Sequence, residues 1–172
     1  PGIRFGFEEA IGYCTDPDAV HDKDGVGAMV HAVSLVEELA AEGKTIEDLL
    51  DDLARTHGLH ATAPLTFRVS DLSIISDSMK KLREVGITEL AGSEVTEAVD
   101  LADGVDGLAP TDGLRYVTAD NDRVVIRPSG TEPKLKCYLE VIVACDGDEV
   151  PRDAAYQRLE RIKTDLHDVL SL

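Results

Sequence analysis

The sequence predicts an α/β fragment, made of two helices and a truncated strand, followed by an α+β domain with an antiparallel sheet and helices on one face. Two observations support this prediction. Residues 24–58 carry apolar positions at the three- and four-residue spacing of amphipathic helices. From residue 63 onward, short β-rich runs separated by turn residues dominate, with two further helical patterns. A chain of 172 residues is long enough for one full domain or two small ones.

The first predicted element is short. Residues 1–7 read as the end of a strand that runs into a loop. They include no initiator Met, no basic segment and no apolar signal core, so they do not resemble a secretion signal. Two helices and a truncated strand cannot bury their own apolar faces. We therefore expect a piece of a longer protein, in which upstream strands complete the first unit.

Capping residues mark the ends of the two helices in the first unit. Asp24 is the predicted N-cap of the first helix, and Gly43 is its predicted end. Thr45 and Asp48 have nearly the pattern of a capping box for the second helix, which continues to Gly58. Each helix has an apolar face, so both are expected to pack against other parts of the protein.

The second unit begins where the helical periodicity ends, which assigns residues 1–60 to the first domain and residues 61–172 to the second. A strand is predicted over 63–69, where Pro64 is acceptable only near the strand start or at a sheet edge. A helix is predicted to begin at Ser70 or Asp71 and to end at Gly86. The later predicted elements are a strand near 95–101, a turn-rich loop over 103–113, strands at 114–118, 123–127 and 136–144, and a helix over 152–170.

Charge and composition exclude several classes of partner. The chain has 17 basic and 34 acidic residues and a net charge of −17, which disfavours binding to nucleic acid. No apolar run approaches the roughly 20 residues that a membrane span needs. The three cysteines, Cys14, Cys137 and Cys145, are odd in number and lack metal-ligand spacing. A disulfide framework and a zinc site are therefore not expected, and a cytoplasmic location fits best.

A basic segment stands out in this acidic chain. Residues 123–138 contain four cations and one acid, and within them Arg-Pro-Ser-Gly-Thr-Glu-Pro-Lys-Leu-Lys occupies 127–136. A phosphate dianion needs such a combination of guanidinium, ammonium, hydroxyl and open backbone N–H groups. The segment therefore predicts a phosphate site between two strands. A hairpin loop with solvated charges is the structural alternative.

Two segments near the N-terminus, one acidic and one with a lysine between acids, are weaker candidates for functional residues. Glu8 and Glu9 form an acidic pair beside glycines, and paired carboxylates can accept hydrogen bonds from the hydroxyls of a sugar. Lys23 lies between two aspartates at a helix start, where the helix dipole and the acids act oppositely on its pKa. Such a lysine can serve as a general acid or base. The alternatives are a solvated acidic pair and a surface lysine. No set of residues has the spacing of a metal site.

In this order, the three segments resemble the C-terminal part of the α-D-phosphohexomutases, which include phosphoglucomutases and phosphomannomutases. Gly-Phe-Glu-Glu at 6–9 is similar to the sugar-recognition loop of that family. Asp-Lys-Asp-Gly at 22–25 is similar to the segment that opens a helix in domain 3, and 127–136 to the phosphate-binding loop of domain 4. By this resemblance, residues 1–60 correspond to the later part of domain 3 and residues 61–172 to domain 4.

The resemblance implies a role for individual residues. Glu8 and Glu9 would hold the sugar hydroxyls, and Lys23 would be the general acid or base. Ala10 departs from the family pattern, because many members have a sugar-contacting serine there. The residues that would hold the phosphate that is not being transferred are Arg127, Ser129, Gly130, Thr131 and Lys136.

The resemblance also implies an activity and its cofactors. The chain would be the substrate-binding part of an isomerase, an intramolecular phosphotransferase that interconverts hexose 1-phosphate and hexose 6-phosphate through a hexose bisphosphate. The phosphoserine loop and the Mg²⁺ loop of the family match nothing in the chain, so Mg²⁺ would be bound outside it and the chain alone would be inactive. Its partners would be a phosphosugar and the N-terminal domains of the same protein. The alternatives are a phosphopentomutase, a free-standing sugar-phosphate-binding module and a purely structural domain.

Overall fold

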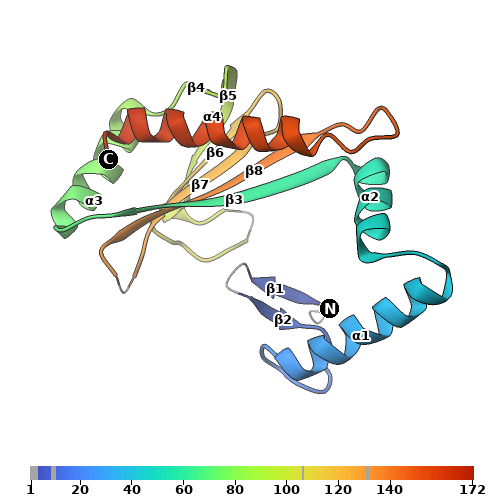
Figure 1. The fold of residues 1–172 in the computed structure, drawn as a ribbon. Coiled ribbons are helices and arrows are strands. Elements are labelled where there is room, and N and C mark those ends of the chain that lie inside the picture. The colour runs from blue at the N-terminus through green and yellow to red at the C-terminus, as the bar shows by residue number, and fades with distance from the viewer. Residues whose placement is uncertain (1–3, 9–10, 106, 131) are drawn as a thin grey trace. The chain divides into compact units, whose positions relative to one another are not determined.

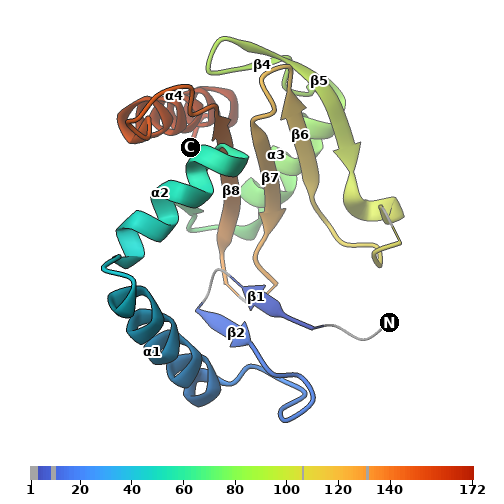
Figure 2. The ribbon, with the colours of Figure 1, turned by 90° about the vertical axis from the view of Figure 1, so that its right-hand side faces the viewer.

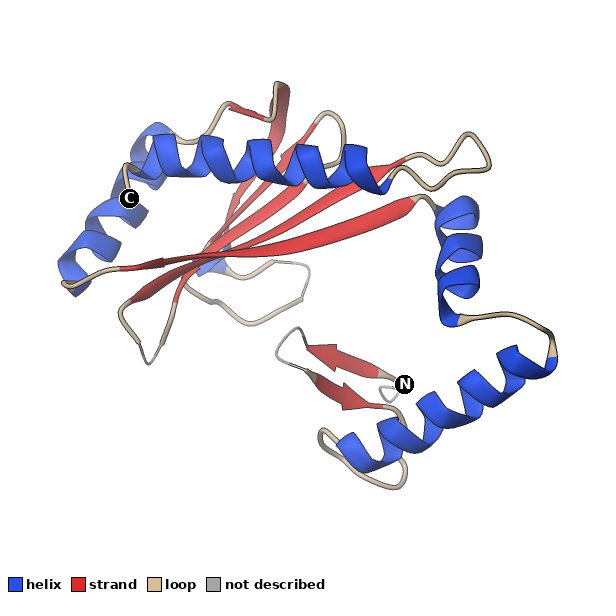
Figure 3. Cartoon of the chain, viewed as in Figure 1, coloured by secondary structure: helices blue, strands red, loops and turns tan. Residues whose placement is uncertain are grey.

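The computed structural model describes residues 4–8, 11–105, 107–130 and 132–172. The chain forms two compact units, Pro1–Asp52 and Leu53–Leu172. Figure 1 shows the elements in chain order and Figure 3 their secondary structure. No helix in the described part of the chain is long and apolar enough to cross a membrane.

The first unit contains a two-stranded antiparallel hairpin and two helical segments. The hairpin consists of β1 (Gly6–Glu8) and β2 (Gly12–Cys14), and it is followed by α1 (Gly25–Ala41) and by α2 (Ile46–His57), whose second half belongs to the other unit. The predicted truncated strand is present as β1, although β2 was not predicted. Three residues are too few for an alternating pattern to distinguish a strand from a turn.

The predicted caps of the two helices are confirmed. The carboxylate of Asp24 accepts a hydrogen bond from the Val26 N–H at 3.0 Å. At α2, the Asp48 N–H donates to the Thr45 hydroxyl at 3.1 Å, and the Thr45 N–H donates to the Asp48 carboxylate at 2.8 Å. This reciprocal pair is the predicted capping box, with aspartate in place of the usual glutamate. Gly43 has a φ of 73°, the left-handed conformation in which a helix commonly ends.

The second unit is a curled antiparallel sheet of six strands with two helices, which confirms the predicted α+β fold class (Figure 2). The strand order is β3-β8-β7-β6-β5-β4. The strands are β3 (Leu59–Arg68), β4 (Glu89–Leu90), β5 (Ser93–Asp100), β6 (Leu114–Thr118), β7 (Arg123–Pro128) and β8 (Lys134–Val143), and the helices are α3 (Leu72–Val85), a short 3₁₀ turn (Leu101–Asp103) and α4 (Arg152–Leu170).

One face of the sheet is buried under α3 and α4. On β8, the side chains that point to this face are almost fully buried, whereas the alternate side chains stay partly exposed. The core residues include Ile75, Met79 and Leu82 of α3, Leu135, Cys137, Leu139 and Val141 of β8, and Leu159, Ile162 and Leu166 of α4. Burial raises the pKa of the Cys137 thiol to about 12, so this cysteine is a core residue and not a reactive one. We call the other side of the sheet the open face.

Strand β3 differs from its prediction. It begins at Leu59, four residues before the predicted start at residue 63, because its first residues pair with the strongly β-forming end of β8 from Leu59↔Val143 onward. The start at Leu59 was not predicted, because the His-Ala-Thr-Ala segment at 60–63 has a low β-propensity. Pro64 lies within the strand and not near its start, and β3 is at the edge of the sheet, so the second of the two predicted alternatives holds.

A buried ion pair fixes the turn between β6 and β7 to α4. The side chain of Asp122 is fully buried, and its Oδ2 accepts from Arg158 Nε at 2.8 Å. Arg158 Nη2 also donates to Asp120 at 2.6 Å. The turn itself is closed by two hydrogen bonds between Thr118 and Asp122. Because water does not reach the Asp122 carboxylate, loss of the arginine alone would leave an unpaired buried charge.

Candidate functional site

The loop that joins β7 and β8 carries the basic segment at 127–136. Its base is closed by a hydrogen bond from the Ser129 N–H to the Lys134 carbonyl at 2.8 Å. Arg127 lies directly opposite Lys136 in the strand register, and both residues alternate with buried neighbours, so their side chains share the open face. A Cβ at Gly130 would meet no atom within 4 Å, so a ligand can approach the backbone there.

The structure thus brings most of the predicted phosphate-binding residues together. Arg127 and Lys136 are neighbours across two strands, and Ser129 and Gly130 belong to the loop that follows β7. Thr131, the remaining predicted member, lies outside the described residues. These positions agree with a phosphate site, and the roles of the individual residues stay predictions.

Glu132, the only acid of the segment 127–136, forms an ion pair with Lys134 of the same segment. Lys134 Nζ lies 2.6 Å from Glu132 Oε1. The pKa of Glu132 is lowered first by this hydrogen bond, then by the charge of Lys134 and by the charges of Arg68 and Lys136. Within the described ranges, no acid forms an ion pair with Arg127 or Lys136, so these two cations are available to an external anion.

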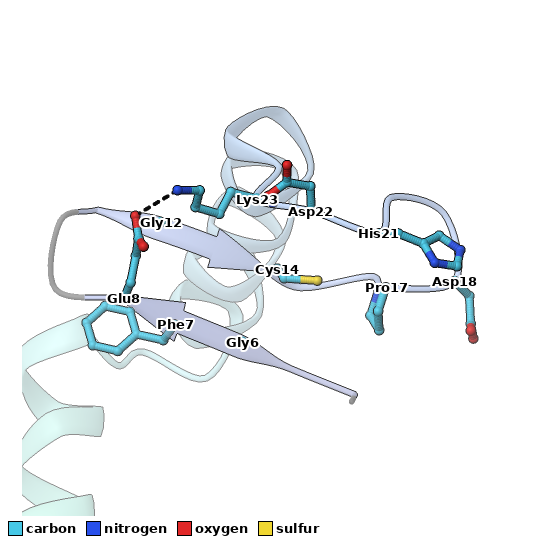
Figure 4. A pocket seen from close by; sticks show the side chains of 10 residues that line it. All are labelled: Gly6, Phe7, Glu8, Gly12, Cys14, Pro17, Asp18, His21, Asp22 and Lys23. Carbon is cyan, nitrogen blue, oxygen red and sulfur yellow. Dashed lines mark hydrogen bonds and ion pairs between the residues drawn. The ribbon is translucent and has the colours of Figure 1, made fainter. Parts of the chain in front are cut away.

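The first unit contains a pocket of about 510 Å³, which two of the predicted sugar and acid–base residues line (Figure 4). Glu8 and Lys23 both line this pocket, and Lys23 Nζ lies 3.1 Å from Glu8 Oε1. The sequence treats the two residues as separate candidates, and the structure joins them. Glu9 and Ala10 lie outside the described residues.

Gly12 is a site residue that the sequence analysis missed. It pairs with Glu8 across the β1–β2 hairpin, and a Cβ at this position would overlap the side chains of Lys23 and Glu8. The Asp24 N–H donates to the Tyr13 carbonyl at 2.8 Å and so holds the start of α1 against β2. A larger residue at this position would push the Lys23 and Glu8 side chains out of their present positions. The signal for it was a glycine close after the acidic pair.

The ion pair with Glu8 stabilises the protonated form of Lys23. The pKa of Lys23 is raised, first by its hydrogen bond to Glu8 and then by the charge of Glu8, while desolvation opposes this and Asp22 adds to it. The sequence predicted that the upward effect comes from the two flanking aspartates, whereas in the structure the largest upward effect comes from Glu8 and outweighs desolvation. In this state Lys23 holds its proton, and its pKa lies further from the neutral range in which general acid–base catalysis is most efficient.

We expect Glu8→Gln to lower the pKa of Lys23, because the variant removes both of the largest causes of the upward shift. The measurement is a titration of the lysine side chains by heteronuclear NMR. Lys44 is the matched control, since Asp52 raises its pKa in the same way at 3.0 Å. An unchanged pKa at Lys23, or an equal shift at Lys44, would contradict the assigned cause.

Most of the second unit matches a known protein family. The model of the phosphoglucomutase/phosphomannomutase C-terminal domain matches residues 68–164, which include the whole basic loop. The chain belongs to the phosphoglucomutase/phosphomannomutase family. The assignment confirms the resemblance that the sequence motifs indicated.

Relatives in the phosphoglucomutase/phosphomannomutase family carry several different names. A probable phosphomannomutase of Haemophilus influenzae is 40% identical over 139 residues, or 81% of this chain and 28% of that protein. A phosphopentomutase of Homo sapiens is 29% identical and covers 98% of this chain and 29% of that protein. A phosphoglucomutase of Staphylococcus aureus is 31% identical, and the match covers 80% of this chain and 27% of that protein. The chain thus spans under a third of the length of these relatives.

The fold of this family member also matches a solved structure. The crystal structure of pp63/parafusin from Paramecium, a phosphoglucomutase in an open form, superposes with a TM-score of 0.69. That match covers 98% of this chain and 31% of the other, at 17% identity. It therefore supports the fold and not the role of any residue.

Within the part of this family member that the structure describes, no three His, Cys, Asp or Glu side chains gather in a way that could hold a metal ion.

Proposed function

We propose that this chain is the C-terminal, substrate-binding part of a phosphosugar mutase that interconverts hexose 1-phosphate and hexose 6-phosphate through a bisphosphorylated intermediate. The observation that carries the proposal is the pairing of Arg127 with Lys136 on the open face, beside a loop whose backbone is open to a ligand at Gly130. The names of the relatives support the same reaction class. Residues 1–60 would be the later part of domain 3 and residues 61–172 would be domain 4.

The basic loop would hold the phosphate that is not being transferred. The guanidinium of Arg127 can donate two parallel hydrogen bonds to phosphate oxygens, and Lys136 adds a point charge. The hydroxyls of Ser129 and Thr131 and the N–H of Gly130 would complete the donors. Such a site contacts the phosphate rather than the sugar ring. It can therefore accept a phosphate from either end of the sugar, as a bisphosphate that reorients requires.

The pocket of the first unit would hold the sugar. Glu8 and Glu9 would accept hydrogen bonds from hydroxyl groups, and a hydroxyl held by Glu8 would lie within reach of the Lys23 ammonium. Lys23 would then donate its proton to the sugar oxygen from which phosphate leaves, and would take a proton from an attacking hydroxyl in the reverse direction. Any Mg²⁺ and any phosphorylated serine would be supplied by segments of the protein other than this chain.

A pentose phosphate is the second candidate substrate. The match to the human phosphopentomutase extends over 98% of this chain, whereas the match to the Staphylococcus aureus phosphoglucomutase extends over 80%. Relative turnover of hexose 1-phosphate and pentose 1-phosphate by the parent protein distinguishes the two.

The three free cysteines agree with the proposed cytoplasmic location.

We expect the full-length parent protein to interconvert hexose 1-phosphate and hexose 6-phosphate, and the 172-residue chain alone to show no turnover. The reason is that a phosphate-binding loop without a nucleophile offers no route for transfer. A coupled assay on both proteins, purified from a host without endogenous mutases, measures this. Turnover by the short chain would overturn its proposed role as a binding part, and no turnover of hexose or pentose phosphates by the parent protein would overturn the mutase assignment.

A further inference from the structure

Arg68, the last residue of β3, lies beside the basic loop although it is far from it in the sequence. The register pairs Arg68 with Lys134, and it pairs Thr66 with Lys136 two residues earlier. Phe67 is buried on the helix-covered face, so its neighbour Arg68 points to the open face. Side chains that lie directly opposite each other have Cβ atoms about 5 Å apart. Arg68 is therefore a lateral neighbour of Lys134.

Backbone hydrogen bonds fix Arg68 relative to the loop. The N–H of Val69, the next residue, donates to the Pro133 carbonyl at 3.1 Å. The N–H of Ser129 donates to the Lys134 carbonyl at 2.8 Å. Three chain segments, the end of β3, the end of β7 and the start of β8, are thus joined at one corner of the sheet. We call this corner, formed by Arg68, Arg127, Lys134 and Lys136, the basic corner.

The basic corner carries more positive charge than its acid neutralises. Of its four cations, only Lys134 forms an ion pair within the described residues, and its partner is Glu132. Like charges on neighbouring strands are destabilising when no anion lies between them. Glu132 also feels the charges of Arg68 and Lys136, so its carboxylate lies where the positive fields of three cations overlap. An external dianion would be favoured at the same place.

We propose that Arg68 is a phosphate-binding residue, which extends the site beyond the loop onto β3, and that Glu132 occupies this site until a phosphate group displaces it. The inference rests on the proposed phosphate site and adds a residue from outside the loop sequence. The ligand class is a phosphate monoester or inorganic phosphate. The planar guanidinium of Arg68 suits two phosphate oxygens, and displacement of Glu132 frees Lys134 as a further donor.

The test is a titration of the 172-residue chain and four variants with inorganic phosphate, followed by isothermal calorimetry or amide chemical shifts. Arg68→Gln should weaken binding about tenfold, which corresponds to the loss of one charged hydrogen bond. Glu132→Gln should bind phosphate more tightly than the parent chain. Arg123→Gln is the matched control: it removes the same charge from the same face, but Arg123 is paired with Glu140 at 2.7 Å. At physiological ionic strength it should change the affinity by less than about twofold.

Arg127→Gln separates failure of this inference from failure of the proposed function. If Arg127→Gln weakens binding and Arg68→Gln, folded with an unchanged unfolding midpoint, binds like the parent chain, Arg68 is not a phosphate-binding residue. If Glu132→Gln binds no more tightly than the parent chain, Glu132 does not occupy the site. If neither arginine variant differs from the parent chain, the phosphate site itself is wrong. Equal losses in Arg68→Gln and Arg123→Gln would show a general effect of charge and would also overturn the proposal.

Discussion

Arg127→Ala is expected to weaken phosphate binding by about ten- to a hundredfold. Removing one charged hydrogen-bond partner typically costs about 1.5–3 kcal/mol, and Arg127 can contribute two parallel bonds to one phosphate. The rest of the acidic chain repels anions, so local geometry rather than overall charge has to supply the affinity. The measurement is a phosphate titration of the variant and of the parent chain at two salt concentrations.

Two further variants serve as internal controls for this result. Ser129→Ala should weaken binding less than Arg127→Ala, because a neutral hydroxyl donates a weaker bond than a guanidinium. Glu132→Ala should bind more tightly than the parent chain, as expected of Glu132→Gln. Affinity should fall as salt rises, since the interaction is between charges on an exposed face. A parent-like affinity of Arg127→Ala would remove the strongest local support for the functional proposal.

Arg158→Met is expected to destabilise the second unit by about 3–5 kcal/mol, the usual cost of leaving a buried charge without its partner. The side chain of Asp122 is fully buried, and its Oδ1 has no hydrogen-bond partner within the described residues. Methionine fills the volume of the arginine stem, so the variant isolates the loss of charge. Chemical denaturation at neutral pH measures the free energy of unfolding.

The pH dependence of the Arg158→Met variant identifies the cause. Burial already raises the pKa of Asp122, with Arg158 as the main opposing influence. Without Arg158 the pKa of Asp122 rises further. A folded protein with such a carboxyl loses stability as the pH rises through the raised pKa. The deficit of the variant should therefore shrink as the pH falls toward the ordinary range of an aspartate. Adding Asp122→Asn should restore much of the stability at neutral pH. A deficit that is independent of pH and of Asp122→Asn would instead indicate a packing defect.

Much of the fold could be predicted from the sequence, because local signals and tertiary contacts agree. The caps Asp24 and Thr45 and the regular apolar spacing of α4 each specify an element without reference to the rest of the chain. Prediction was weaker where pairing decides the structure. The start of β3 at Leu59 depends on its partner Val143, and β4 consists of only two residues. Neither leaves a periodic pattern in the sequence.

The candidate site shows the same division. The basic loop was predictable because its residues are consecutive and contrast with an acidic chain. The ion pair between Lys23 and Glu8 joins residues 15 positions apart, and its geometry depends on Gly12. Arg68 approaches the loop only through the pairing of β3 with β8. Contacts of this kind follow from sheet register, which the sequence alone does not specify.

The most direct test of the phosphate site is a map of amide chemical shifts on the ¹⁵N-labelled 172-residue chain titrated with inorganic phosphate and, separately, with a hexose 6-phosphate. We predict saturable shifts centred on the β7–β8 loop, including Ser129 and Gly130, and extending to Val69 at the end of β3. Both ligands should shift the same amides, because the phosphate group is what the loop recognises. Shifts that do not saturate, or that centre on lysines elsewhere such as Lys80 and Lys163, would contradict the account.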